Sequence, residues 1–326
     1  MERGDQPKRG VRNMSGTERL KSDAGGIARA VDHLRAGRRV AFPTETVYGL
    51  GADARSDAAV AGIYAAKGRP SFNPLIVHVA DADAAQQIAR FDDVAERVTQ
   101  AFWPGPLTIV APLRPDAGIS RLVTAGLDSV AIRVPDHPLA QALLRQFDGP
   151  LAAPSANPSG RVSPTRPEHV LIGLDGAIAA ILDGGNCRVG LESTILRIGP
   201  PPVLLREGGI PREAIAACLG AVPATPEHTD RPDAPGQLTS HYAPKGTIRL
   251  DATDAEDGEF LIGFGDVAGD VSLSASGDLV EAASRLFETL HHCDTVGAER
   301  IAVAPIPRKG LGLAINDRLS RAAADR

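Results

Sequence analysis

Apolar residues recur along the chain at two spacings, and each spacing predicts one kind of element. Ile27, Val31 and Leu34 repeat about once per helical turn, and Gly37 closes that predicted helix. Short apolar runs bounded by proline, glycine and polar residues predict strands instead. Such runs lie at 39–42, 75–79, 107–113, 129–134, 151–153, 177–182, 193–198 and 203–206.

Helices alternate irregularly with these strands. Ser56 can cap a helix in which Val60, Ile63 and Tyr64 share one face, and Lys67 follows on that face one turn later. Because several strands return after hairpin-length connections, the pattern predicts an α/β fold with a mixed sheet. Further helices of this first part are predicted at 84–89, 94–102 and 139–147.

Composition divides the chain into four parts. Residues 1–22 mix charges with small polar residues and show no period, so we expect a disordered tail. A first domain spans 23–220, and the Pro-, Thr-, Asp- and His-rich segment 221–246 predicts an interdomain linker. Residues 247–326 predict a small α/β domain, with strands at 247–250, 260–263 and 301–304 and helices at 279–290 and 311–322.

Composition and charge restrict the class of protein. A chain of 326 residues with 43% hydrophobic and 23% charged residues fits a globular protein of about two domains. A net charge of -5 argues against a protein that coats nucleic acid, although it allows a local basic cleft. The three cysteines lie far apart without a CxxC motif, which disfavours disulfides and structural zinc. Without a membrane span or a signal peptide, we expect a cytoplasmic protein.

The stretch 43–54 brings hydroxyl groups and glycines together directly after a strand. Pro43 ends the strand because it lacks an amide donor. Gly49 and Gly51 let the backbone approach a ligand or adopt a positive φ. Three hydroxyl groups stand among them, at Thr44, Thr46 and Tyr48. The stretch is either a polar turn between a strand and a helix or a binding loop.

Common site motifs are incomplete or missing from the sequence. Residues 49–54 match GxGxxA, but the next helix begins only near Ser56, whereas a dinucleotide site needs the glycines at the helix mouth. The sequence has no GxxxxGK[ST] phosphate loop and no GxSxG nucleophile elbow. The run His291–Asp294 is either metal-binding or a helix end, and a helix end is favoured because adjacent helical positions face different ways.

Cationic residues beside loop breakers are more informative. Lys67, Arg69, Arg133 and Arg206 each stand next to a loop rich in hydroxyl groups or glycine, although any one of them can be a solvated surface charge. Together they indicate a pocket for a polyanion and a carboxylate, because arginine forks match carboxylate and phosphate oxygens. His78, within an apolar strand, is either a core histidine or a ligand-binding group.

A series of motifs resembles the YrdC-domain family. They are 43–54, Lys67–Pro70, Phe72–His78, Trp103–Thr108, Ala131–Pro135, Pro154–Gly160 and Glu192–Ile195. The chain is most similar to the two-domain threonylcarbamoyl-AMP synthases of that family, whose linker carries a run like Pro235–Gly236 followed by His241–Pro244. The resemblance covers residues 25–326 and leaves out the preceding tail.

The resemblance implies an enzyme that converts L-threonine, bicarbonate and ATP into threonylcarbamoyl-AMP and pyrophosphate. This is the first stage of threonylcarbamoyladenosine formation on tRNA. The implied fold is a twisted mixed sheet with a basic concave face and a small Rossmann-like C-terminal domain. Mg²⁺ would arrive with ATP, without assigned protein ligands. A separate tRNA threonylcarbamoyltransferase would receive the product, and we expect weak or no direct tRNA binding and no membrane contact.

The resemblance also implies roles for particular residues. Lys67, Arg69 and Arg133 are expected to be catalytic by stabilising charge, with Lys67 near the phosphates of ATP, and no general base is assigned. The implied threonine site contains Thr46, His78, Arg133, Ala153 and Ser193. The implied ATP site contains Arg69, Asn73, Ser129, Ser155, Ser163, Arg206 and Tyr242. The linker, with its tyrosine, is expected to act as an active-site lid.

Two positions depart from the family pattern. Ser129 stands where many members have threonine, which keeps the hydroxyl group. Ser240 stands where many members have a basic residue, so no phosphate contact is assigned there. Two other functions stay open: an RNA-binding module without catalysis, and carbamoyl transfer of the hydrogenase-maturation type. Proteins of the latter type carry zinc-finger and acylphosphatase-like regions that this sequence lacks.

Overall fold

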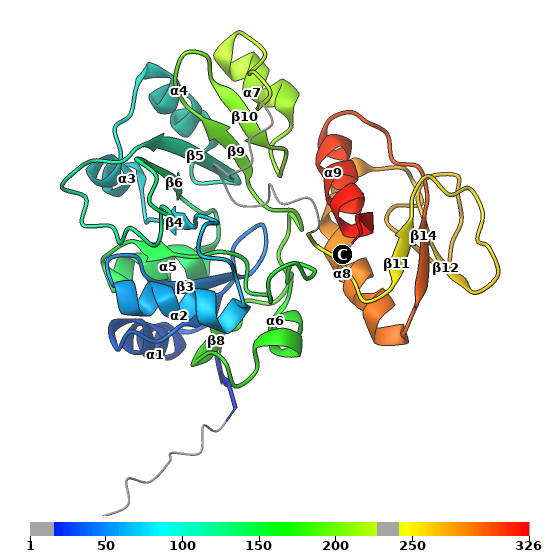
Figure 1. The fold of residues 1–326 in the computed structure, drawn as a ribbon, viewed down its shortest axis with the longest axis horizontal. Helices are drawn as coiled ribbons and strands as arrows, with labels where there is room; N and C mark the ends of the chain where they lie inside the picture. Colours follow the sequence, from blue (N-terminus) through cyan, green and yellow to red (C-terminus); the bar gives the residue numbers. More distant parts are fainter. Residues whose placement is uncertain (1–15, 227–240, 326) are drawn as a thin grey trace, which may run out of the picture.

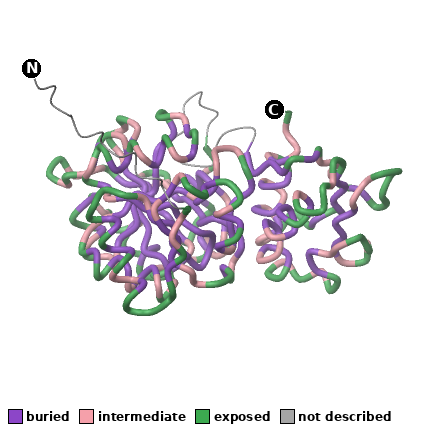
Figure 2. Tube along the Cα trace, turned by 90° about the horizontal axis from the view of Figure 1, so that it is seen from below, coloured by how far each residue is buried: buried purple, intermediate pink, exposed green. Residues whose placement is uncertain are grey.

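The computed structural model of the protein describes residues 16–226 and 241–325. Within these residues, the strands form a ten-stranded mixed sheet and a four-stranded parallel sheet, each with its own helices (Figure 1). Buried segments run through the middle of both parts (Figure 2). The expected α/β class, with a large mixed sheet and a second, smaller α/β domain, is confirmed.

The large sheet organises the first domain. Its strands are β1 (Glu18–Leu20), β2 (Val40–Phe42), β3 (Gly49–Asp53), β4 (Ile76–His78), β5 (Leu107–Pro112), β6 (Ser129–Arg133), β7 (Leu151–Ala152), β8 (Ala180–Leu182), β9 (Thr194–Arg197) and β10 (Val203–Arg206). The surrounding helices are α1 (Ala24–Arg35), α2 (Asp57–Lys67), α3 (Ala82–Ile88), α4 (Asp93–Phe102), α5 (Pro138–Phe147), α6 (Pro167–Leu174) and α7 (Arg212–Leu219). Across the sheet, the order is β1-β8-β2-β3-β7-β4-β6-β5-β9-β10.

Strand alternation gives this sheet two different faces. Val77 of β4 and Ile132 of β6 point into the main apolar cluster, which α2, α3 and α4 complete. Because successive side chains of a strand point to opposite faces, His78 and Arg133 face the other way. On that other face, α1 and α5 cover one end of the sheet in a second apolar cluster. The central strands beyond them are left to form the floor of a cavity.

The C-terminal domain packs its helices toward the first domain. Its elements are β11 (Thr247–Arg249), β12 (Glu259–Gly263), β13 (Val271–Ser272), α8 (Leu279–Val296), β14 (Arg300–Val303) and α9 (Leu311–Ala323). The strands are parallel, in the order β11-β14-β12-β13. In Figure 1, α8 and α9 lie between this sheet and the large domain.

One apolar cluster is shared by the two domains. Val47, Val162 and Leu191 of the first domain belong to the same buried cluster as the inner faces of α8 and α9. The contact at Gly190 is especially close, because a Cβ there would lie 2.5 Å from the Cα of Ser284 in α8. Gly190 also has a φ of 74°, a conformation that favours glycine. The loop before β9 is therefore seated directly on α8.

The predicted disordered tail is wrong for its last residues. Residues 18–20 form β1, which pairs in parallel with β8 and buries Leu20. Glu18 and Arg19 on the same strand make ion pairs with residues of α1, α6 and the end of β8. A three-residue strand with a single buried apolar side chain leaves no periodic signal, which is why the sequence pattern missed it. Residues 1–15 lie outside the described residues.

The stretch 43–54 is also more regular than predicted. Its second half is β3, which pairs antiparallel with β2. Gly51 is required there for packing, because a Cβ would lie 2.9 Å from the ring of Phe42. Gly49 and Gly51 both keep a negative φ, so neither serves the positive-φ role considered from the sequence. Helices α6 and α7 were not predicted either, and each begins at or beside a proline.

Both described ends of the linker are attached to the first domain. Ala224 exchanges backbone hydrogen bonds with Pro202 and Leu204 beside β10, and Ala243 donates its amide to the carbonyl of Gly160. Pro235, Gly236 and Ser240 lie outside the described residues. Among the residues that are described, no helix combines the length and apolar character needed to cross a membrane.

Candidate functional site

A cavity of about 530 Å³, including its open mouth, lies over the centre of the large sheet, at the boundary between the domains. Its lining residues are Thr44, Thr46, Val47, Gly49, Arg69, Ile76, His78, Arg133, Ala153, Pro154, Ser155, Glu192, Ser193, Arg206, His241 and Tyr242. All five predicted threonine residues are among them. So are four of the seven predicted ATP residues: Arg69, Ser155, Arg206 and Tyr242.

Strand register places the floor of the cavity. His78 of β4 is directly opposite Arg133 of β6, and Arg133 is opposite Thr108 of β5. On the other side, Gly49 is paired with Ser155 across β3 and the loop after β7. Residues that are paired across neighbouring strands share a face. The polar groups of four separate sequence segments are thus brought to one surface.

Three buried arginines line this cavity. Arg69, Arg133 and Arg206 are 9%, 4% and 8% exposed, respectively. Burial, together with the nearby Arg206 guanidinium, lowers the pKa of Arg69 to about 10, so Arg69 stays protonated at neutral pH. Burial likewise lowers the pKa of Arg206. Such a concentration of partly desolvated cations favours an anionic ligand.

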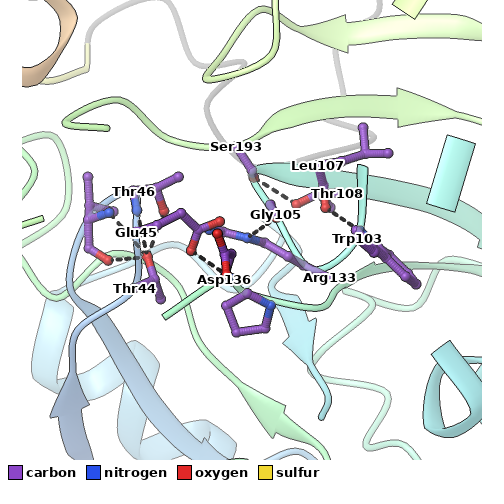
Figure 3. Close-up of polar contacts among 12 residues, drawn as sticks. Thr44, Glu45, Thr46, Trp103, Gly105, Leu107, Thr108, Arg133, Asp136 and Ser193 are labelled. Atoms are coloured by element: carbon purple, nitrogen blue, oxygen red, sulfur yellow. Dashed lines mark hydrogen bonds and ion pairs between the residues drawn. The ribbon is translucent and has the colours of Figure 1, made fainter. Parts of the chain in front are cut away.

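Arg133 is held beside a carboxylate that the sequence reasoning missed. Its Nη2 lies 2.7 Å from Oε1 of Glu45, and its Nε donates to the carbonyl of Gly105 (Figure 3). The ion pair is not aligned for a hydrogen bond, and neither of its two atoms has a hydrogen-bond partner among the described residues. Arg133 is therefore charge-balanced while Nη2 keeps hydrogen-bonding capacity. The signal in the sequence was the position of Glu45 between Thr44 and Thr46.

The hydroxyl of Ser193 is fixed by two neighbours. It lies 2.7 Å from the hydroxyl of Thr108 (Figure 3). It also accepts from Nη2 of Arg206 at 3.1 Å. Arg206 also donates to the carbonyl of Ser193. Nearby, Thr44 donates to the carbonyl of Val47 and lies 2.7 Å from the hydroxyl of Thr46. These hydroxyls are oriented before any ligand binds.

His78 is buried and also lines the cavity. The two interpretations offered by the sequence, a core histidine and a ligand-binding group, therefore do not exclude each other. Burial and the neighbouring Arg133 lower the pKa of His78 to about 3. Its imidazole is consequently neutral at physiological pH and can contact a ligand without adding charge. The ring meets Phe42 edge-on, with centroids 6.1 Å apart, which fixes its orientation.

Tyr242 closes the cavity from the C-terminal side. It is 1% exposed and has a φ of 62°, which is uncommon for a residue with a side chain. Its ring packs 5.5 Å from that of Phe287 in α8 and under the guanidinium of Arg318. A strained backbone held by packing is typical of a functional position. His241 lines the same wall, where burial lowers its pKa to about 3.

Glu192 and Arg318 were also missed. Glu192 lines the cavity, accepts from the hydroxyl of Ser163 at 2.5 Å and from Nε of Arg318 at 2.8 Å. Burial opposes ionisation of Glu192, but Arg318, Arg206 and the two hydrogen bonds outweigh it, and its pKa lies below the ordinary value. Ser163 thus contacts Glu192 and does not itself line the cavity. The acidic partner Glu192 and the basic partner Arg318 are far apart in sequence, so no local motif indicated this ion pair.

Three other predicted residues lie outside the cavity lining. Asn73 is fully buried, and its side-chain amide has no hydrogen-bond partner among the described residues. Ser129 begins β6, on the face of Arg133 but four residues away along the strand. Lys67, at the end of α2, donates from Nζ to the carbonyl of Ser155 at 2.6 Å and to that of Asn157. The left-handed cap Gly68 then redirects the chain toward Arg69.

These contacts change what we expect of Lys67. Its ammonium group is buried, and burial together with Arg69 lowers its pKa well below the ordinary value. We therefore expect Lys67→Met to lower the free energy of unfolding by about 1–3 kcal/mol, because two buried carbonyls lose their donor. The loop 154–160 would also lose its anchor, so ATP affinity should fall.

The control for Lys67 is Lys309→Met, which removes an exposed ammonium group. Urea unfolding and ATP titration of both variants test the prediction. Unchanged stability of a Lys67→Met protein that no longer makes product would instead place Lys67 on the phosphates, as its motif implied.

The run at 291–294 lies within α8, two to five residues before its last residue, and is not a frayed terminus. His291 is buried and stacks on His169 of α6, with ring centroids 3.8 Å apart. Within the described part of the chain, no group of three or more His, Cys, Asp or Glu side chains is arranged to hold a metal ion. His291 therefore serves the domain contact.

Comparison with known families divides the chain at the same place as the two sheets. Residues 32–208 match the Sua5/YciO/YrdC family, whose description is "Telomere recombination". Residues 210–324 match the family described as "Threonylcarbamoyl-AMP synthase, C-terminal domain".

Several curated proteins are similar over almost the whole chain. A Bacillus subtilis protein named threonylcarbamoyl-AMP synthase is 42% identical over 334 residues, which span 95% of this chain and 96% of that protein. A Pyrococcus abyssi protein of the same name is 40% identical, across 91% and 94% of the two chains. A Serratia proteamaculans protein of that name matches over 40% of this chain but 70% of its own length, so it is much shorter.

Solved structures agree with these similarities. The crystal structure of P. abyssi Sua5 complexed with L-threonine has a TM-score of 0.87 and 37% identity, and covers 94% of this chain and 97% of that one. Full-length HypF, in a phosphate- and nucleotide-bound form, matches with a TM-score of 0.51 and 19% identity, covering 56% of this chain and 29% of that one. The likeness to HypF concerns the fold alone.

Proposed function

The chain belongs to the threonylcarbamoyl-AMP synthases of the Sua5/YciO/YrdC family, and from this premise we propose how its cavity joins L-threonine, bicarbonate and ATP. The observation that carries the proposal is the convergence of Arg69, Arg133 and Arg206 on one buried surface. A nucleotide triphosphate and an amino acid together bring a phosphate chain and a carboxylate. Three buried guanidinium groups match that set of anions.

Bond making and breaking need no covalent link to the protein in this proposal. The amine of threonine adds to the carbon of bicarbonate with loss of water, or to that of carbon dioxide derived from it with loss of a proton, and gives a carbamate. A carbamate oxygen then attacks the α-phosphorus of ATP, and the bond to the β-phosphate breaks to release pyrophosphate. The protein contributes orientation and charge stabilisation, with Arg69 and Arg206 on the phosphates.

We place threonine over the floor of the sheet. Arg133 would bind its carboxylate, because Arg133 lines the cavity and its Nη2, although beside Glu45, has no hydrogen-bond partner among the described residues. The ordered hydroxyls of Thr46 and Ser193 would contact the amino acid's polar groups. His78 and Ala153 complete this subsite. The L-threonine bound to P. abyssi Sua5 supports this assignment by similarity.

ATP would bind between the loop 154–160 and the C-terminal wall. Ser155 and Tyr242 line the cavity there, and Ser163 acts through Glu192. We propose that the linker is a lid, because Tyr242 at its end already covers the cavity. Closure would protect the carbamate and the mixed anhydride from water. Asn73 and Ser129 keep their predicted nucleotide roles only if ATP reaches beyond the present lining.

We propose that Mg²⁺ enters as part of the ATP complex. Glu192 is the carboxylate that lines the cavity, and both of its oxygens already accept hydrogen bonds. The donor set therefore fits an ion held mainly by phosphate oxygens and water, which is common for Mg²⁺. The ion would neutralise phosphate charge during the displacement.

The product is an activated carbamoyl donor, so we propose that a separate tRNA threonylcarbamoyltransferase consumes it. The net charge of -5 supports weak or no direct tRNA binding by this chain. We place the enzyme in the cytoplasm, where its free thiols Cys187, Cys218 and Cys293 would stay reduced.

Pyrophosphate release tests the proposal directly. With ATP and Mg²⁺ present, we expect release only when L-threonine and bicarbonate are both added, and we expect loss of the signal after chelation with EDTA. L-Serine in place of L-threonine serves as the matched substrate control. Release without threonine, or no release while tRNA is bound in a steeply salt-dependent way, would contradict the proposal and favour the RNA-binding alternative.

A further inference from the structure

Arg318, in α9 of the C-terminal domain, is a charged residue in an unusually buried environment. No proposed catalytic group lies in this domain. Arg318 is 0% exposed and is among the largest fully buried side chains of the protein. Arginine is rarely buried completely unless it is paired. On the helix it stands beside Ile315 and Leu319, which belong to the apolar cluster shared by the domains. An apolar side chain at this position would also pack into that cluster, so packing alone does not explain why the residue is an arginine.

The guanidinium group of Arg318 contacts the first domain at two points and the end of the linker at a third. Nε donates to Oε2 of Glu192 at 2.8 Å, and Nη2 donates to the carbonyl of Glu207 at 2.9 Å. The guanidinium carbon also lies 5.2 Å from the centre of the Tyr242 ring, in cation–π geometry. Nη1 is held by the neighbouring Asp317 at 2.6 Å. Each of the three nitrogens of this group thus has an acceptor, and one face meets an aromatic ring.

Two of the partners of Arg318 belong to the wall of the cavity. Glu192 and Tyr242 line it, and Ser193, which follows Glu192, carries the hydroxyl fixed by Thr108. The carbonyl of Glu192 accepts from the amide of Gly209, so this segment is also fixed to the chain after β10. On its other side, the segment is seated on α8 through Gly190.

We propose that Arg318 is a positioning residue for the cavity, which aligns Glu192, Ser193 and Tyr242 from the C-terminal domain. This inference rests on the proposed function and adds a reason for the second domain. Arg318 does not reach the substrates itself. It orders the segment 190–193 through Glu192 and fixes the aromatic wall through Tyr242. A shift of about 1 Å in such a wall can lower a rate by about a hundredfold.

The experiment compares Arg318→Met, Arg318→Lys and Glu192→Gln with the double variant Arg318→Met/Glu192→Gln. The control is Arg285→Met, which removes an exposed guanidinium group from the ion pair with Glu281 in the same domain. For Arg318→Met we expect kcat/KM to fall about a hundredfold. Arg318→Lys keeps the charge but cannot engage Glu192 and Glu207 together, so it should recover only part of the activity.

The pH profile separates positioning from a general loss of stability. In the native protein, Glu192 is faced by Arg318 from α9, Arg206 from β10, and His241 and Tyr242 from the linker end. Removing Arg318 removes a cause that lowers the pKa of Glu192, so this carboxyl should protonate nearer neutral pH. The activity of Arg318→Met relative to wild type should therefore fall as pH falls. This dependence should disappear in the double variant.

Hydrogen exchange supplies a readout that is independent of activity. Amides of 190–193 should exchange faster in Arg318→Met than in Arg285→Met, with the rest of the large sheet unchanged. A folded Arg318→Met protein with wild-type kcat/KM, unchanged exchange, or effects additive with Glu192→Gln would overturn the inference. If Arg318→Met does not fold, the same readouts on Arg318→Lys decide the matter. Absence of threonine-dependent pyrophosphate release in the wild type would instead refute the proposed function.

Discussion

Replacing Arg133 with lysine is expected to raise the KM for L-threonine by about a hundredfold, while the KM for ATP changes by less than about threefold. Lysine keeps the positive charge beside Glu45, so the buried ion pair survives. It cannot offer the two parallel donors of a guanidinium fork to a carboxylate. The effect should therefore be confined to the amino acid. Steady-state kinetics with each substrate varied in turn measures both constants.

A second set of variants separates binding from stability at this position. Arg133→Met leaves Glu45 buried without its partner and should destabilise the fold by about 3–5 kcal/mol. Arg133→Met/Glu45→Gln removes both charges and should recover most of that stability, but not the affinity for threonine. If Arg133→Lys changes both constants equally, or changes that for ATP more, Arg133 belongs to the nucleotide subsite.

A chain that ends after Leu219 is expected to make threonylcarbamoyl-AMP at least about a hundredfold more slowly than the full chain. The truncation removes Tyr242, which covers the cavity, and Arg318, which pairs with the buried Glu192. The first domain should still fold, because its two main apolar clusters are made of its own residues.

The truncated chain has one structural liability that the test must control. Val47, Val162 and Leu191 pack against the C-terminal domain and would become exposed. Circular dichroism and thermal melting establish that the shortened protein is folded, and size-exclusion chromatography with light scattering establishes that it is monomeric. The full-length variant Tyr242→Ala/Arg318→Met should reproduce most of the defect without exposing the whole interface. A folded, monomeric and fully active truncated chain would mean that the linker is only a tether.

The pattern of apolar residues was sufficient for most long elements of the fold. Helical spacing located α8 and α9, and apolar runs located β5 and β6, because each of these elements buries a whole face or stripe. Short elements were less accessible. β1 buries a single side chain, and β3 consists largely of glycine and alanine, so neither leaves a periodic signal. Their pairing with distant strands is what makes them regular.

In the candidate site, too, some residues could be predicted from the sequence and others could not. Arg69, Arg133 and Arg206 could be predicted because each stands beside a loop that breaks a regular element. The contacts of Lys67 could not be predicted, because the carbonyls to which it donates belong to a loop about ninety residues later. Glu192 and Arg318 were missed for the same reason, since they are separated by 126 residues.

By itself, the sequence determined the α/β class, the family motifs and the set of charged and hydroxyl-bearing residues from which the cavity is built. The residue types and the local periods suffice for this, because they depend on neighbours within one turn or one strand. Only the tertiary structure decided which of those groups face the cavity and which support it. Strand register sets Arg133 beside His78, and domain packing sets Arg318 on Glu192. Both are contacts between distant segments, and local spacing carries no information about them.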